Sequence, residues 1–301
     1  MRDEKRLNQA YKDSPVLPLT SGSKYILFSD CHRSIGTSAD IFLKNQTLYF
    51  AALQHYFRQG YTYIELGDGD ELWQNRSFQE IASIHSNVFW LLSKYYKKNR
   101  LYMIYGNHDI VKSRRGYAKK NCSVHYNEPT RKYVPLFPDI QFYPGIRLQE
   151  KQAEYELFLT HGHQVDFLNS AIWPIARFLV RYLWTPLENI GVLDPTSAAK
   201  NYTKKNKTER KLSEWADKYN CVLIAGHTHR PMVPEPGDIP YFNTGSCVHP
   251  RCITGIEIHG NQLTLIKWTQ CVRADNSLAI CREELDQFPL NQIPEQLKSL
   301  N

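Results

Sequence analysis

The sequence lacks any apolar run of the roughly 20 residues that a membrane-spanning helix needs. Its first residues, MRDEKRLNQAYKDS, are charged and contain no apolar stretch of the kind that marks a secretory signal peptide. The chain also contains neither an internal repeat nor a low-complexity linker. These absences predict a cytoplasmic globular protein, with any membrane contact peripheral and at the inner face.

Cysteine is scattered rather than paired along the chain. The seven cysteines form no CxxC motif, which argues against a zinc ribbon and against a redox dithiol. Scattered thiols are typical of proteins from a reducing compartment. We therefore expect reduced, buried cysteines at positions 31, 122, 221, 247, 252, 271 and 281.

Charge is unbalanced, with a formal net charge of +7 over 301 residues. An excess of positive charge suits an anionic partner: a phosphate ester, a nucleic acid or an acidic membrane surface. No basic platform rich in aromatic residues stands out, so nucleic acid is the least favoured of the three. The hydrophobic content of 42% is that of a globular protein with a core, in one large domain or two small ones.

The first half alternates between short apolar runs and amphipathic stretches. Residues 24–29, 61–66 and 101–106 are expected to form buried strands, and residues 43–57 and 78–96 are expected to form helices. This order predicts a largely parallel sheet covered by helices.

The second half of the chain does not continue this alternation of strands and helices. Residues 145–148 and 155–160 predict a hairpin, and residues 221–225 predict another buried strand. Further strands are expected at 240–245, 254–258 and 262–266, with a turn at 259–261.

No strand is expected between residues 164 and 220, and we predict that this segment is a helical cap inserted into the core. The chain then divides into an N-terminal arm (1–20), one domain (21–270) and a C-terminal tail (271–301).

Polar side chains stand at the ends of five of these strands. The stretch YGNHD places an amide, an imidazole and a carboxylate in a row, at Asn107, His108 and Asp109. Buried polar groups cost roughly 1–3 kcal/mol each unless they find partners, so these residues form either a polar turn or part of a site. The other strand ends carry Asp30 and His32, Asp68, His161 and His163, and His227 and His229.

The convergence of these strand ends favours a metal site. In an open α/β sheet the carboxyl ends of the strands meet at one edge, where ligands bind. Carboxylate and amide oxygens mixed with imidazoles suit manganese, iron or zinc. The ligands are too many for one ion and fit two divalent ions about 3.5–4 Å apart, Mn²⁺ being favoured. Such a pair lowers the pKa of a water molecule between the ions and holds the phosphoryl oxygens for in-line attack.

The order of the motifs DxH, GDxx[DE], GNH[DE], HGH and GHxH resembles that of the calcineurin-like metallophosphoesterases over roughly residues 24 to 268. The resemblance implies an α/β fold, a four-layer sandwich of two mixed sheets flanked by helices, with a dinuclear site. It assigns one metal to Asp30, His32 and His229, the other to Asn107, His161 and His227, and the bridge to Asp68.

The same resemblance gives His108 a catalytic role. Its imidazole would contact the substrate phosphate and assist protonation of the leaving group. Asp109 would orient that imidazole.

A part of the chain is similar to the UDP-2,3-diacylglucosamine pyrophosphohydrolases of this family. GDGDELW matches their GDxxExW form, with Glu71 and Trp73 in place, and GHTHRP at 226–231 matches as it stands. Those enzymes also have a helical insertion between the HG and GHTHRP motifs. The chain departs from them at His108 and His163, where they typically have arginine and aspartate, so their substrate does not transfer to it.

The inserted segment is apolar around most of a helix from Ser170 to Trp184, apart from Arg177 and Arg181 one turn apart. Two interpretations stay open: the helix packs on the core, or it caps the metal edge with an apolar wall and two guanidinium groups. Such a wall suits an acyl or isoprenoid chain or a membrane surface, and the arginines suit a second phosphate.

A basic loop follows GNHD and includes Arg114 and Arg115. These arginines either bind an anionic substrate or belong to a loop without a specific partner.

The favoured function is a dinuclear metal-dependent phosphoesterase that acts on a phosphorylated small molecule or a lipid-linked substrate. The bond would be a monoester, a diester or a pyrophosphate. Two alternatives remain: a nuclease of the same family, and a non-catalytic scaffold of the same fold. Scaffold members tend to lose metal ligands or the catalytic histidine, whereas this chain keeps all of them.

Overall fold

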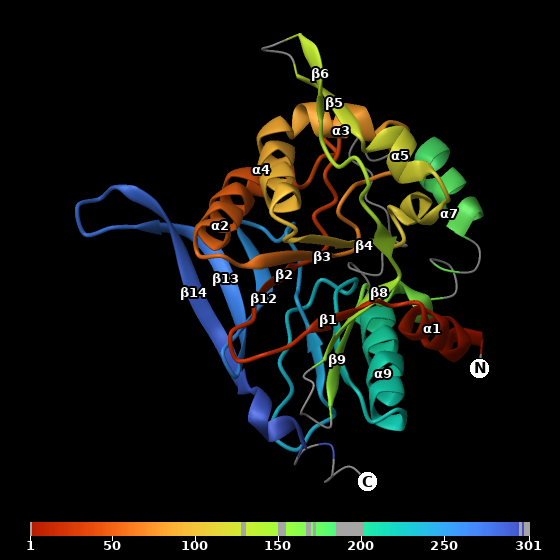
Figure 1. The fold of residues 1–301 in the computed structure, drawn as a ribbon, viewed down its shortest axis with the longest axis vertical. Helices are drawn as coiled ribbons and strands as arrows, with labels where there is room; N and C mark the ends of the chain where they lie inside the picture. Colours follow the sequence, from red (N-terminus) through yellow and green to blue (C-terminus); the bar gives the residue numbers. More distant parts are fainter. Residues whose placement is uncertain are drawn as a thin grey trace.

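Two stacked β-sheets form the centre of the protein, and helices cover both outer faces (Figure 1). The computed structural model describes residues 2–127, 131–149, 155–166, 170, 173–184, 202–294 and 297. One sheet has seven strands in the order β14-β13-β12-β2-β3-β4-β7, and the other has five in the order β1-β8-β9-β10-β11.

The seven-stranded sheet combines a parallel half with an antiparallel half. Strands β2, β3, β4 and β7 are parallel, whereas β12, β13 and β14 continue the sheet in antiparallel order. Its strands are β2 (Lys24–Phe28), β3 (Thr62–Leu66), β4 (Leu101–Ile104), β7 (Phe142–Tyr143), β12 (Cys252–His259), β13 (Gln262–Val272) and β14 (Leu278–Pro289).

The five-stranded sheet contains the predicted hairpin. Strands β8 and β9 are antiparallel, and β9, β10 and β11 run parallel to one another. Its strands are β1 (Val16–Pro18), β8 (Gly145–Gln149), β9 (Glu156–Thr160), β10 (Val222–Ala225) and β11 (Tyr241–Asn243). A separate hairpin joins β5 (Val124–Asn127) to β6 (Lys132–Pro135), which the sequence analysis did not anticipate.

The alternation of side chains along β2 explains the layers. Ile26 and Phe28 pack against α2 and α4, in a core that includes Tyr49 and Leu92. Tyr25 and Leu27 point to the opposite face and pack in the core between the two sheets. The outer face of the second sheet is covered by α1 and α9, through residues such as Leu7 and Trp215. The predicted four-layer α/β architecture is therefore confirmed.

The helices that cover the sheets vary in length. The helix expected at 78–96 is divided at His85, because this buried imidazole hydrogen-bonds the loop after β2, 3.0 Å from the Ser34 carbonyl and 3.1 Å from Asp40. The helices are α1 (Arg2–Lys12), α2 (Gln46–Arg58), α3 (Phe78–Ile84), α4 (Ser86–Lys97), α5 (Tyr117–Asn121), α7 (Trp173–Leu179) and α9 (Tyr202–Lys218).

The segments predicted as an N-terminal arm and a C-terminal tail both contain regular secondary structure. Residues 1–20 include α1, which buries Leu7 and Ala10, and β1, which pairs with β8. Residues 271–301 include the end of β13 and all of β14, the edge strand of the larger sheet. The division into domains stays a prediction.

One cysteine expectation is wrong. Cys271 and Cys281 form a disulfide between β13 and β14, with Cα atoms 6.0 Å apart. The two residues are brought together because Cys281 pairs with Thr269, two positions from Cys271 on the neighbouring strand. The other five cysteines are free, and four of them are buried.

The inserted segment is mostly helical where the structure describes it. It contains α7, the π-helical segment η4 (Val180–Trp184) and α9, and its described residues form no strand. Residues 167–169, 171–172 and 185–201 of the predicted cap lie outside the described residues. No helix in the described part of the chain is long and apolar enough to cross a membrane.

Candidate metal centre

The predicted ligands come from five strands of both sheets. Asp30 and His32 follow β2, Asp68 follows β3, and Asn107 follows β4. In the other sheet His161 follows β9, and His227 and His229 follow β10. Because β2, β3 and β4 are parallel to one another, as are β9 and β10, the carboxyl ends within each set lie together.

The side chains at these strand ends gather into two main groups. Asp30, His32 and His229 form one, and Asp68, His161 and His227 form the other, with potential ligand atoms within 4.8 Å of one another in each. His229 Nε2 lies 3.0 Å from Asp30 Oδ1, and His161 Nε2 lies 3.1 Å from Asp68 Oδ2. The first group is the set that the motif order assigned to one metal. The second contains His161 and His227 from the set assigned to the other metal, together with Asp68, the predicted bridge.

The two groups are in contact with each other. His32 Nε2 lies 3.8 Å from Asp30 Oδ1 and also 3.8 Å from Asp68 Oδ2. His161 Nε2 lies 4.0 Å from Asp30 Oδ1. Asp68 therefore lies close to histidines of both groups, and its role as a bridge stays a prediction.

Four ligand atoms at these strand ends are buried and, among the described residues, make no hydrogen bond of acceptable geometry, although two of them lie 3.0–3.1 Å from a neighbouring ligand atom. They are Asp30 Oδ1, Asn107 Oδ1, His161 Nε2 and His227 Nε2. Leaving a buried polar atom unpaired costs about 1–3 kcal/mol, so four such atoms in one place need an explanation. Divalent cations would satisfy all four, since each atom can be a lone-pair donor of the type that such ions bind.

Hydrogen bonds behind the ligands fix their orientation. His161 Nδ1 donates to the Leu66 carbonyl at 2.8 Å, which leaves the lone pair of Nε2 directed at the site. His32 Nδ1 lies 3.0 Å from Glu71 Oε2, and the backbone N–H of His227 donates to Asp30 Oδ2 at 3.0 Å. Such outer contacts are typical of metal-binding histidines.

The backbone at this edge is unusual. Five of the predicted ligands have positive φ angles of 49° to 67°: Asp30, His32, Asp68, His227 and His229. A left-handed conformation costs a residue with a side chain roughly 1–2 kcal/mol. Strain concentrated in this way is characteristic of functional sites.

The charges at the site act on one another. Burial lowers the pKa of His161, but the Asp68 and Asp30 carboxylates outweigh it and raise this pKa to about 9. Burial raises the pKa of Asp68. The His161 and His108 imidazoles lower this pKa by more than burial raises it, and hold it well below its usual range. The carboxylate is therefore ionised, as a metal ligand must be.

His108 lies beside the ligands in the position predicted for a catalytic group. Its ring is 4.6 Å from that of His32 and stacks on Trp73 at 4.5 Å with an interplanar angle of 24°. His108 Nδ1 lies 2.9 Å from Glu71 Oε1. Burial lowers the pKa of His108, but Glu71 and Asp68 raise it to about 9.

The role predicted for Asp109 is wrong, because its carboxylate binds elsewhere. It accepts hydrogen bonds from Lys112 Nζ at 2.6 Å and from the backbone N–H groups of Gly106 at 2.7 Å and Gly69 at 3.2 Å. Asp109 thus joins the loops after β3 and β4, and the carboxylate that orients His108 is Glu71. The signal for Glu71 was its place in GDGDELW, three residues after Asp68.

The arginines predicted to bind substrate divide into different roles. Arg181 donates to the carbonyls of Leu72, Trp73 and Asn75 at 2.7–2.9 Å, so it ties the cap segment to the loop of GDGDELW. Arg177 Nε is buried and has no hydrogen-bond partner within the part of the chain that the structure describes. Burial, together with the charges of Arg181 and Arg114, lowers the pKa of Arg177.

Arg114 joins this basic cluster from the loop after GNHD, with its guanidinium 5.3 Å from the centre of the Trp173 ring. Arg115 is exposed. His163, next to the ligand His161, is buried with Nδ1 unpartnered, and its burial lowers its pKa well below the usual value.

The family model of the calcineurin-like phosphoesterases matches residues 23–231. The chain belongs to this family. The match covers the motifs from Asp30 to His229, so the family predicted from their order is confirmed. A family of metal-dependent phosphoesterases accounts for the lone-pair donors at the strand ends.

Solved structures with a similar fold include two of the protein Vps29. One, vacuolar protein sorting 29 from Cryptosporidium parvum, is 15% identical, with a TM-score of 0.35 over 88% of this chain and 98% of that one. Vps29 from Chaetomium thermophilum is 10% identical, with a TM-score of 0.41 over 89% of this chain and 99% of that one. Likeness at this level carries no functional information. No curated protein sequence matches the chain.

Proposed function

We propose that the protein is a dinuclear metal-dependent phosphoesterase that hydrolyses a phosphate ester or pyrophosphate bond. The observation that carries this proposal is a set of four buried ligand atoms at adjoining strand ends of the two sheets, which make no hydrogen bond of acceptable geometry within the described residues: Asp30 Oδ1, Asn107 Oδ1, His161 Nε2 and His227 Nε2. Two divalent cations, Mn²⁺ in the first place and Fe or Zn as alternatives, would supply activation of a water molecule and charge neutralisation of a phosphoryl group.

In this proposal the residues of the chain hold and orient the reacting groups. Asp68 lies between the two ligand groups and holds them at a fixed separation. His108 is the proton donor to the leaving group, because its Nδ1 is held by Glu71 and Nε2 remains as the second exchangeable position. Trp73 stacks on the same ring and limits its rotation.

The cap segment supports a lipid-bearing substrate. Arg181 fixes this segment to the loop that contains Glu71 and Trp73, so it lies beside the site. Its apolar side chains are unusually exposed: Phe178 at 60%, Ile175 at 59% and Leu183 at 49%. Arg177 and Arg114 add positive charge that suits a second phosphate. An acyl or isoprenoid chain, or a membrane surface that presents one, would cover this apolar surface.

A hydrolysis panel with added Mn²⁺ tests the proposal. It should compare p-nitrophenyl phosphate, bis-p-nitrophenyl phosphate, UDP-sugars, an oligonucleotide and lipid pyrophosphates, each with the parent protein and with Asp68→Asn. Turnover that is lost in the variant is expected on at least one ester. Binding of two ions without turnover on any substrate would indicate the scaffold alternative instead.

A further inference from the structure

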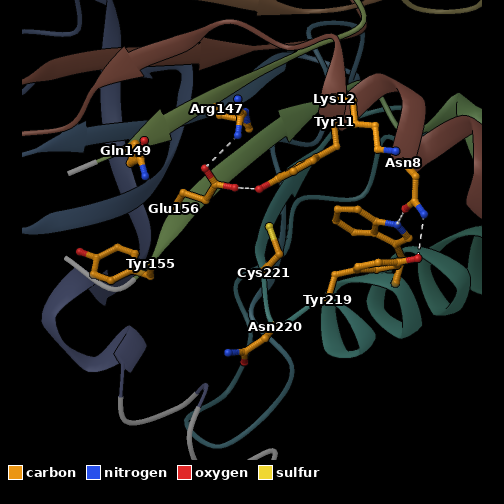
Figure 2. Close-up of a pocket in the computed structure, with 11 residues that line it drawn as sticks. Asn8, Tyr11, Lys12, Arg147, Gln149, Tyr155, Glu156, Tyr219, Asn220 and Cys221 are labelled. Atoms are coloured by element: carbon orange, nitrogen blue, oxygen red, sulfur yellow. Dashed lines mark hydrogen bonds and ion pairs between the residues drawn. The ribbon is translucent and has the colours of Figure 1, made fainter. Parts of the chain in front are cut away.

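A cavity of about 650 Å³ lies far from the metal centre, between α1, the start of β9 and the end of α9 (Figure 2). It reaches Glu156, five residues before His161 on the same strand, and Cys221, six residues before His227. At about 3.3 Å per residue, five residues of strand span about 16 Å. The cavity and the metal centre are therefore at opposite ends of β9 and β10.

The cavity forms where the helices stop covering the outer face of the second sheet. Phe158 is buried on this face against Tyr11 and Trp215. Glu156 points to the same face two residues earlier, and Arg147 lies diagonally across from it on β8. The strand thus presents an ion pair at the point where the apolar packing ends.

Neighbouring side chains hold Arg147 in place, but its guanidinium N–H groups make few hydrogen bonds to the described residues. Its guanidinium lies 4.9 Å from the centre of the Tyr11 ring, and its Nη1 is 3.6 Å from Glu156, longer than a hydrogen bond. Its Nε is buried and, among the contacts of the described residues, has no hydrogen-bond partner. Glu156 also accepts a hydrogen bond from the Tyr11 hydroxyl, so Tyr11 and Glu156 together position the arginine.

The opposite wall of the cavity is aromatic and rigid. Trp215 and Tyr219 lie side by side with ring centres 5.0 Å apart and ring planes tilted by 33°. The Asn8 side chain joins them, since it accepts from Trp215 Nε1 and donates to the Tyr219 hydroxyl, each at 2.7 Å. Cys221 lies between the two walls (Figure 2), and burial raises the pKa of its thiol to about 12, so the floor is uncharged.

We propose that this cavity is a second ligand site, which binds a small planar aromatic anion. The anionic group, a carboxylate or a phosphoryl group, pairs with the Arg147 guanidinium, whose fork of donors matches such oxygens. The ring packs against Tyr219 and Trp215. Lys12, also in the lining, adds a second positive charge. A volume of about 650 Å³ is within the range of small-molecule sites.

Binding of defined probes to the full chain tests the proposal. Indole-3-carboxylate and phenylphosphonate represent the two kinds of anion, and indole-3-carboxamide is the neutral match of the first. A fragment of this size is expected to bind with a Kd of about 1 mM, and the carboxamide at least about 10-fold more weakly. The anion that binds with the lower Kd identifies the preferred acidic group.

Variants separate this site from the metal centre, which also attracts oxyanions. Arg147→Gln should weaken binding of the anion at least about 10-fold. Arg210→Gln, on the exposed face of α9 outside the cavity, is the matched control and should bind like the parent, as should Asp68→Asn. If Arg147→Gln does not fold, Tyr219→Ala provides the second test, because removing the ring should weaken the aromatic anion but leave the fold intact.

Nuclear magnetic resonance locates the bound probe independently. The indole N–H signal of Trp215, assigned by Trp215→Phe, should shift as the anion is titrated. Four results would each overturn the proposal. Two concern the probes: equal affinity for the carboxylate and the carboxamide, or no saturable binding of either anion. Two concern the variants: unchanged binding in both cavity variants, or loss of binding only in Asp68→Asn.

Discussion

The metal centre predicts a large dependence of thermal stability on divalent cations. At a free ion concentration of about 100 times Kd, one bound ion adds about 2.7 kcal/mol to the free energy of unfolding. Two independent ions then add about 5 kcal/mol. The entropy of unfolding of a 301-residue chain is about 0.6 kcal/mol/K, so the expected rise in Tm is about 8 °C.

The assay is differential scanning calorimetry of the chelated protein, with and without added Mn²⁺. Asp68→Asn should lose most of the rise in Tm, because this carboxylate lies between both ligand groups. His229→Ala should lose about half of it, since it belongs to one group only. His259→Gln, at an exposed histidine at the end of β12, is the control and should keep the full shift. An identical Tm with and without Mn²⁺ in the parent would refute the reasoning.

Three further predictions concern activity. His108→Ala should bind metal normally but lower kcat by roughly 100-fold or more on an ester with a poor leaving group, measured by steady-state kinetics; near-normal kcat would remove its assigned role. Glu71→Gln should lower kcat in the same assay, whereas removing Asp109, which contacts Lys112 instead, should act through stability and appear as a lower Tm. Phe178→Ala with Leu183→Ala should erase a preference for an acylated substrate, worth about 0.8 kcal/mol per buried CH₂ group, without changing kcat/KM for p-nitrophenyl phosphate. Equal kcat/KM of the parent for acylated and deacylated substrates would contradict that last expectation.

The set of candidate ligands could be predicted because a simple rule of geometry governs it. A parallel strand delivers the residue after it to the same edge as its neighbours, whatever the details of packing. The short apolar runs before Asp30, Asp68 and Asn107 identified those strands. The parallel pairing of β9 with β10 places His161 beside His227 in the same way.

The partner of His108 could not be predicted by adjacency. Asp109 is next to it in sequence, but its carboxylate is used by Lys112 and two backbone N–H groups. Glu71 arrives from a different loop, 37 residues away, and its position depends on tertiary structure. Sequence proximity is thus a poor guide to the orienting group when several loops meet.

The strand β14 in the C-terminal segment could not be predicted either, because it also depends on tertiary contacts. β14 is an edge strand with many exposed or half-exposed residues, so it lacks the apolar run that marks a buried strand. Its pairing with β13 fixes it in place, and that pairing also brings Cys271 and Cys281 together. The spacing of the cysteines along the sequence does not by itself indicate the disulfide between Cys271 and Cys281.

The left-handed backbone at five predicted ligands limits how these positions can change during evolution. Only glycine, and to a lesser degree asparagine and aspartate, adopt such φ angles readily, so most substitutions at Asp30 or His229 would add strain as well as remove a ligand. A descendant that no longer needed metals would gain stability by replacing these residues with glycine or asparagine. Aspartate and histidine at these five positions therefore carry a cost in stability that glycine would not carry.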